Sequence, residues 1–340
     1  MKTLRLPVFP VAAVLSVSLI AAAGVSLTFG AIDIPKTEVF AALSQLFNGQ
    51  YELSISQAIV AEMRLPRVLL AALVGGLLAL AGVIIQALIR NPMADPYLLG
   101  VSNGASLAMV LLFVYGGTLI NQPVLPQLIA GLGGFGAFSL VLLLAHNNKG
   151  PLNSNQLILA GIAISFMLSA ITSLVMLSSE SHRLPGIMQW MMGSLVDANW
   201  AQLPLLLASL LIGLAVTLKK AQLLDVLLLG DDKAATLGVN IKKHRLIWSA
   251  LTALLTGVAV SQVGVVGFIG LMVPHFARFL VGGGHLKLIP IATLFGALMA
   301  ILVDLLCRTL IRPEELPMGI PMAIIAMPFF IWLLRSNHAR

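Results

Sequence analysis

Long stretches without a charged side chain divide this sequence, and short polar segments separate them. Charge-free apolar runs flank Lys219–Arg245, a segment that alone holds nine of the 33 charged residues. A helix needs about 20 apolar residues to cross the hydrocarbon of a bilayer, and several runs reach that length. Only 10% of the chain is charged, against roughly 25% in soluble domains. These features predict an all-α, polytopic membrane protein.

The uncharged windows predict a bundle of about ten transmembrane helices. The first run, Leu6–Ile32, is too long for a signal peptide and is interpreted as an uncleaved first span. The stretch Leu246–Ala277 is too long for one helix, and its glycines predict a break near Gly264. The predicted spans are 8–30, 66–89, 97–115, 125–145, 155–178, 200–218, 246–263, 265–281, 288–309 and 317–334. Residues 1–340 then form a single transmembrane domain.

The distribution of basic residues predicts the orientation of the spans. With ten spans and a cytoplasmic N-terminus, fourteen of the 20 Lys and Arg residues fall on the cytoplasmic side and six on the outer side. This imbalance follows the positive-inside rule. Both termini and the segment 219–245 are therefore predicted to be cytoplasmic. The net charge of +7 reflects this topology, and no nucleic acid partner is expected.

Two polar segments are expected to lie outside the hydrocarbon. Residues 181–199 are too broken to span, and we expect a short extracytoplasmic interfacial helix anchored by Trp190 and Trp200. Within 219–245, Asp231 or Asp232 is expected to cap a short helix that leaves through a left-handed Gly238. We interpret this helix as a docking surface for another subunit. Three basic residues after it are interpreted as anchors at the membrane surface: Lys242, Lys243 and Arg245.

The sequence contains none of the motifs that would give the chain its own catalytic chemistry. GxxxxGK[ST] does not occur, so ATP hydrolysis would require a partner, and HExxH is also missing. The six histidines have no metal-ligand spacing, and neither a metal site nor a cofactor is predicted. The spans hold almost no ionisable residues, which argues against an ion-coupled secondary transporter. A membrane enzyme would need a His/Asp/Glu cluster, and none is found.

Arginines near the outer ends of two spans stand out from the other charges. Asp304 and Arg308 are one helical turn apart and can form an ion pair, or Arg308 can be an exposed recognition charge. Arg64 and Arg67 flank Pro66 where the second span is predicted to open. Arginines that flank a membrane span usually anchor its end at the membrane surface. Together with Arg308, they could instead engage carboxylates of a partner protein.

Four motifs follow one another in register from about Arg64 to the C-terminus. In order they are Met63–Ser106, which contains RNPMADP, then WMMGSL at Trp190–Leu195, Gly264–Leu280 and Asp304–Gly319. Together they resemble the FecCD permease family, the transmembrane subunits of type II ABC importers for iron-siderophores, haem and cobalamin. The resemblance implies a cobalamin-permease-like fold in a bacterial inner membrane, with ten helices per subunit.

The resemblance also implies partners and roles. The family forms homodimers that bind two ATPase subunits and an extracytoplasmic substrate-binding protein. Arg64, Arg67 and Arg308 match family arginines that meet glutamates of the binding protein. The helix around 231–238 matches the element that couples to the ATPase, and Asn153 with Ser154 matches a cytoplasmic gate. The coupling residues expected on this basis are Asp231, Asp232, Ala235, Leu237 and Gly238.

The expected function is that of a permease subunit carrying an iron chelate, either a ferric siderophore or haem. WMMGSL slightly favours these cargoes. A cobalamin permease of the same family is the alternative, and an ion-coupled secondary transporter is the alternative from another class.

Overall fold

The structure is a computed structural model that describes residues 4–30, 32–48, 54–122, 125–145 and 154–338. Within these residues all regular elements are helices, as the sequence predicts. Seven of them are long and apolar enough to cross a bilayer, and three shorter apolar helices accompany them. The seven are α1 (Val8–Thr28), α4 (Leu65–Ile89), α6 (Leu125–Ala145), α7 (Ser154–Leu177), α9 (Leu203–Lys219), α12 (Ile241–Val263) and α14 (His285–Thr309). The other three are α5 (Val101–Tyr115), α13 (Ile269–Val281) and α15 (Gly319–His338), whose apolar part is Gly319–Ile331. Each predicted window overlaps one of these ten helices.

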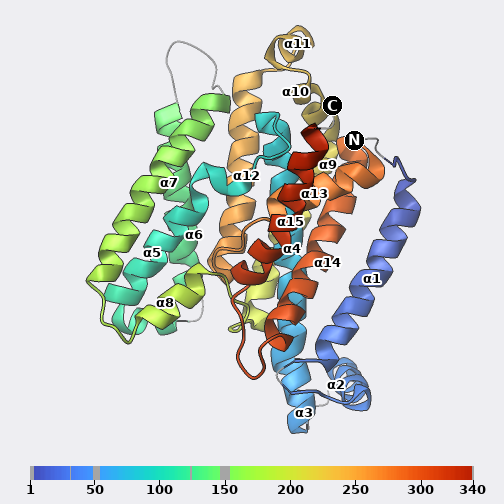
Figure 1. The fold of residues 1–340 in the computed structure, drawn as a ribbon, viewed down its shortest axis with the longest axis vertical. Helices are drawn as coiled ribbons and strands as arrows, with labels where there is room; N and C mark the ends of the chain where they lie inside the picture. The colour runs from blue at the N-terminus through green and yellow to red at the C-terminus, as the bar shows by residue number, and fades with distance from the viewer. Residues whose placement is uncertain (1–3, 31, 49–53, 123–124, 146–153, 339–340) are drawn as a thin grey trace.

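The remaining helices connect the spans at the two ends of the bundle (Figure 1). One end carries α10 (Ala221–Leu228) and α11 (Asp231–Thr236), together with the start of α1 and the end of α15. We call it the loop end. The opposite end carries α2 (Lys36–Asn48), α3 (Ile55–Ala58) and α8 (Leu184–Met191), and we call it the arginine end. Short turns of other helix types are η1 (Ile59–Arg64), η2 (Pro96–Leu99), η3 (Gly117–Asn121) and η4 (Trp200–Gln202).

The grouping of the chain ends with the α10–α11 segment confirms the predicted pairing of these regions at one end of the bundle. Which end faces the cytoplasm stays a prediction. α4 lies at the centre of the fold, and its side chains from Val74 to Ile89 are all buried. α14 packs against it without side chains between the two backbones. A methyl group at Gly75 would lie 2.2 Å from the carbonyl oxygen of Gly296. Close contact between small residues is a common way for membrane helices to associate.

The second span begins earlier than the sequence predicts. The expectation that Arg64–Arg67 opens it is wrong, because the helix already starts at Ile55 behind a Ser54 capping box. Pro66 has no backbone N–H to donate, and its ring disturbs the preceding turn. The chain adapts through a π-helical turn, in which the Leu65 N–H donates to the carbonyl of Val60. Helix therefore continues past Pro66 into α4.

The predicted break at Gly264 is confirmed. α12 ends at Val263, and Gly264 follows with a φ of 74°, in the left-handed region. A side chain at this position would also collide with the chain, because a Cβ atom would lie 2.0 Å from the carbonyl oxygen of Trp190. α13 then starts at Ile269 as a separate, shorter helix.

Candidate functional site

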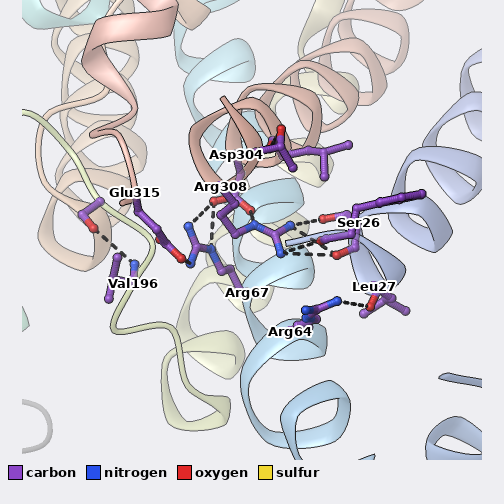
Figure 2. Close-up of polar contacts among 12 residues, drawn as sticks. Ser26, Leu27, Arg64, Arg67, Val196, Asp304, Arg308 and Glu315 are labelled. Carbon is purple, nitrogen blue, oxygen red and sulfur yellow. Dashed lines mark hydrogen bonds and ion pairs between the residues drawn. The ribbon is translucent and has the colours of Figure 1, made fainter. Parts of the chain in front are cut away.

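Three arginines meet at the arginine end, two of them close together in sequence and the third more than 240 residues later. Arg64 ends η1, Arg67 lies in the first turn of α4, and Arg308 lies in the last turn of α14. They are 6%, 9% and 3% exposed. The expectation of Arg308 as an exposed recognition charge is therefore wrong for the chain as folded here. Figure 2 shows Arg64 and Arg308 pointing toward Leu27 and Ser26 at the end of α1, and Arg67 pointing toward Asp304 and Glu315.

Asp304 is the shared partner of two of these arginines. Its Oδ1 lies 2.8 Å from Nη2 of Arg67, and its Oδ2 lies 3.1 Å from Nε of Arg308. The predicted Asp304–Arg308 ion pair, one helical turn apart, is thus confirmed. Arg67 also reaches Glu315, whose Oε2 is 2.8 Å from its Nη1. Figure 2 shows the Arg67 guanidinium lying between the two carboxylates.

The other contacts of Arg64 and Arg308 are with the C-terminal end of α1. Arg64 donates to the carbonyls of Leu27 and Thr28, at 2.7 and 2.9 Å, and to that of Ile32. Arg308 donates to the carbonyl of Ser26 at 3.3 Å and to its hydroxyl. The last carbonyls of a helix have no partner within the helix, and positive charge is favourable there. These arginines therefore tie α1 to the rest of the bundle.

The cluster carries an excess positive charge. Three guanidiniums, those of Arg64, Arg67 and Arg308, face two carboxylates, those of Asp304 and Glu315. A further ion pair at the surface, Arg312 with Asp33 at 3.0 Å, is balanced in itself. The cluster therefore holds one more positive than negative side chain.

The predicted short helix at the loop end exists as α11, but its cap differs from the prediction. Gly230 is the N-cap residue, with a φ of 102°, and no side chain caps the helix. The expectation that Asp231 or Asp232 caps it is wrong. The predicted left-handed exit at Gly238 is confirmed by its φ of 80°.

Asp231 points toward the bundle and binds two arginines. Its Oδ1 lies 2.8 Å from Nη2 of Arg245 and 3.4 Å from Nη2 of Arg90. Arg245 lies in the first turns of α12 and is buried, so the expectation of a membrane-surface anchor is wrong at this position. A nearby carboxylate explains its burial, because a buried charge requires a partner. α11 is thereby attached to both α4 and α12.

The opposite face of α11 is exposed. Of the predicted coupling residues, Asp232, Ala235, Leu237 and Gly238 are all exposed, whereas Asp231 is half-buried. Leu237 is 62% exposed, and Leu228 and Leu229 at the end of α10 are also exposed. Exposed leucines on a segment that projects from the bundle are typical of a protein contact surface.

Of the other predicted residues, Asn153 lies outside the described residues, and Ser154 is the first residue of α7. The segment 181–199 does contain a short helix, α8, near the arginine end. Trp190 is partly buried, and the indole N–H of Trp200 donates to the carbonyl of Ala61 at 3.1 Å.

A cavity between η2, α5 and α7, with several polar side chains in a mainly apolar lining, was not predicted from the sequence. It has a volume of about 340 Å³, and its polar lining comes from Asp95, Tyr97, Ser102, Asn103, Ser165 and Ser169. Burial raises the pKa of Asp95 to about 6, although a hydrogen bond from the Tyr97 N–H to its carboxylate opposes the shift. The serines lie four residues apart near the middle of α7, and this spacing was the available signal.

Comparisons with known proteins agree with the motifs. The model of the FecCD transport family matches residues 18–336. The Fe(3+) dicitrate transport permease FecC of Escherichia coli is 40% identical over 84% of this chain and 85% of its own length. The hemin transport permease HmuU of Yersinia pestis is 39% identical, over 88% and 91%. The vitamin B12 import permease BtuC of Vibrio cholerae is 38% identical, over 84% and 85%.

The fold also resembles solved structures. A metal-chelate type ABC transporter in an inward-facing conformation matches with a TM-score of 0.83 and 31% identity, over 96% of this chain and 99% of that one. PsaBC of Streptococcus pneumoniae matches with a TM-score of 0.55 at 14% identity, over 86% and 94%, which shows a likeness of fold alone.

Proposed function

The chain belongs to the FecCD transport family, and we propose that it is the permease subunit of an ABC importer for a ferric chelate, with iron citrate, a siderophore or haem as cargo. The observation that carries the proposal is the full-length match to a metal-chelate transporter. Relatives named for ferric citrate and hemin support the cargo class. Cobalamin is the alternative cargo, because a vitamin B12 permease is nearly as similar.

We place the ATPase contact on the exposed face of α11. Leu237, Leu228 and Leu229 form an apolar patch beside the acidic Asp232. In this proposal a separate ATP-binding-cassette subunit binds this patch, and the loop end faces the cytoplasm. The sequence has no GxxxxGK[ST] motif, which is consistent with ATP being hydrolysed by that subunit.

The substrate-binding protein would dock at the arginine end. The excess guanidinium of the buried cluster attracts carboxylates, and charge-assisted hydrogen bonds between such groups are strong. Arg64 is the most suitable contact, because the bonds described above join it to backbone carbonyls, which a carboxylate can replace. Docking therefore requires the outer ends of α1 and α4 to separate enough to admit the incoming side chain.

The cargo would pass beside α7, between two copies of the chain. A cavity with a carboxylate, an amide and hydroxyls midway along a span is unfavourable against lipid, so water or a second copy is expected to cover it. A cysteine placed at Ser169 should react with a membrane-impermeant maleimide in the assembled transporter. Failure to react under all nucleotide conditions would contradict this path.

The importer is tested in liposomes that contain the permease together with an ATP-binding-cassette ATPase and a substrate-binding protein with which it co-purifies. We expect ATP-dependent accumulation of iron supplied as ferric citrate, a ferric siderophore or haem, and none of cobalt supplied as cobalamin. Uptake of cobalamin alone would identify the alternative cargo. Uptake without ATP, driven by an ion gradient, would contradict an ABC importer.

Two variants separate the proposed contacts. Leu237→Asp should abolish co-purification of the ATPase while binding-protein affinity is unchanged, and Leu119→Asp at the other end is the matched exposed-leucine control. Arg64→Gln should weaken binding-protein association at least 10-fold while the ATPase stays bound. If both variants lose the same partner, the assignment of the two ends is wrong.

A further inference from the structure

A second attachment of the α10–α11 segment lies at the start of α14. Asp225 of α10 and His285 of α14 are 60 residues apart in sequence. The Oδ1 atom of Asp225 lies 2.5 Å from the ring Nδ1 of His285 and 3.1 Å from its backbone nitrogen. The His285 side chain is fully buried, whereas that of Asp225 is 42% exposed.

The contact replaces a helix cap that α14 lacks. The N-cap residue of α14 is Gly284, which has no side chain to accept from the first N–H groups. Asp225 supplies a carboxylate from another helix, accepts the His285 N–H, and places negative charge at the N-terminus of α14. A carboxylate can only accept, so the imidazole donates through Nδ1.

Without Asp225 the start of α14 would be weakly held. Three consecutive glycines, Gly282–Gly284, join it to α13, and Gly282 has a φ of 91°. Glycine has more backbone freedom than any other residue, so this joint can bend. The Asp225–His285 contact fixes the helix at the point where the chain itself is most flexible.

The other end of α14 leads to the arginine cluster. α14 has 25 residues and is therefore about 37 Å long. It carries His285 in its first turn and Asp304 and Arg308 in its last turns. Midway it contacts the α4 backbone at Gly75 and Gly296, and at its end Asp304 binds Arg67 of α4. α4 and α14 are therefore joined along their length.

α4 is attached to the loop end as well. Its C-cap residue, Arg90, binds Asp231 of α11 at 3.4 Å. The α10–α11 segment thus has two attachments to the α4–α14 pair, through Asp225 to α14 and through Asp231 to α4. Movement of the segment can therefore reach the arginine end through these two contacts and the two packed helices.

We propose that Asp225 and His285 are positioning residues that latch the α10–α11 segment to α14, so that the segment and the α4–α14 pair move as one body during transport. The latch transmits displacement between the ATPase contact and the binding-protein contact. The proposal rests on the importer function above and assigns the route by which its two ends communicate.

The test measures ATP hydrolysis and iron uptake in the same liposomes containing the complete transporter. His285→Leu keeps the apolar volume and removes the donor, and Asp225→Ala removes the acceptor. Both should keep at least half of the wild-type ATP hydrolysis while uptake per ATP falls at least 5-fold. His285→Asn keeps a donor near the Nδ1 position and should restore coupling to within 2-fold of wild type.

Further variants separate coupling from folding. The double variant Asp225→Ala/His285→Leu should be no worse than either single variant, because one interaction is lost in all three. Glu180→Ala, which removes an exposed carboxylate 3.6 Å from His182, is the matched control and should resemble wild type. If His285→Leu does not assemble, Asp225→Asn provides a milder loss of the same contact.

The outcomes distinguish the latch from the importer itself. Wild-type uptake with an unchanged ratio of uptake to hydrolysis in Asp225→Ala and His285→Leu would contradict the latch alone. An equal fall of hydrolysis and uptake would also contradict it, because a merely structural contact gives that result. No ATP-dependent uptake by the wild-type protein would contradict the proposed importer.

Discussion

At each end of the molecule one aspartate pairs with two arginines, but the two pairs differ in their exposure to water. At the arginine end Asp304 binds Arg67 and Arg308, and at the loop end Asp231 binds Arg90 and Arg245. The Asp304 side chain is 1% exposed, whereas that of Asp231 is 35% exposed. One carboxylate lies in a closed core of charges, and the other lies at the base of a helix that projects from the bundle.

The difference shows how burial changes the role of similar ion pairs. The buried Asp304 network holds α1, α4 and α14 together. Removal of one of its charged side chains would leave another buried charge without a partner. Water partly screens the Asp231 network and weakens its ion pairs. The network can therefore orient α11 while contributing little to the stability of the fold. The first network is suited to fixing structure and the second to presenting a contact surface.

Asp304→Asn should give the largest effect. The substitution leaves Arg67 and Arg308 buried with only Glu315 as a carboxylate, and removal of one member of a buried ion-pair network costs about 3–5 kcal/mol. SDS titration in mixed micelles would measure the loss in free energy of unfolding. A loss below about 1 kcal/mol would show that water reaches the cluster and that the contrast between the ends is wrong.

Asp231→Asn is the matched change at the loop end. It removes the charge but keeps an oxygen that can accept from Arg245, so we expect a loss of about 1–2 kcal/mol, below that of a fully buried ion pair because Asp231 is partly screened by water. The same SDS titration measures it. α11 should also become more accessible to protease near Lys233. A loss as large as that of Asp304→Asn would mean that both networks fix the fold equally.

Asp95 extends the comparison to a carboxylate without an arginine. Within the part of the chain that the structure describes, no basic side chain forms an ion pair with it, and burial raises its pKa to about 6. Because this pKa exceeds the usual aspartate value of 3.8, folding is more favourable when the group is protonated. The free energy of unfolding should therefore decrease as the pH rises from about 4 to about 6 and stay constant above.

Asp95→Asn should remove this pH dependence. At pH 7.5 the variant should be more stable than wild type by about 1–2 kcal/mol, which is below the ~3 kcal/mol of a two-unit shift because the carboxylate lines an open cavity. At pH 4 the two proteins should unfold alike. Greater wild-type stability at pH 7.5 would mean that the ionised carboxylate has a favourable partner.

The spans could be predicted from the sequence, and the ion-pair networks could be predicted only where they are local. Hydropathy depends on the bilayer and not on packing, so each window located its helix. The Asp304–Arg308 pair followed from its spacing along one helix. Arg67 and Glu315 are 248 residues apart, and their contact depends on how α4 and α14 pack. Arg245 and Asp231 are only 14 residues apart, but their contact depends on how α11 folds back onto α12, which the sequence pattern does not show.

Arg312→Gln should give the smallest effect and provides the reference for an exposed pair. Arg312 binds Asp33 at 3.0 Å on the same end as the buried cluster, but both side chains are at least one-third exposed. Exposed ion pairs contribute about 0–1 kcal/mol, so unfolding in the SDS titration should change by less than 1 kcal/mol and the change should shrink further in 0.5 M salt. A larger, salt-independent loss would show that the surface pair belongs to the buried network, and the closed core of charges would then extend from Arg67 to Asp33.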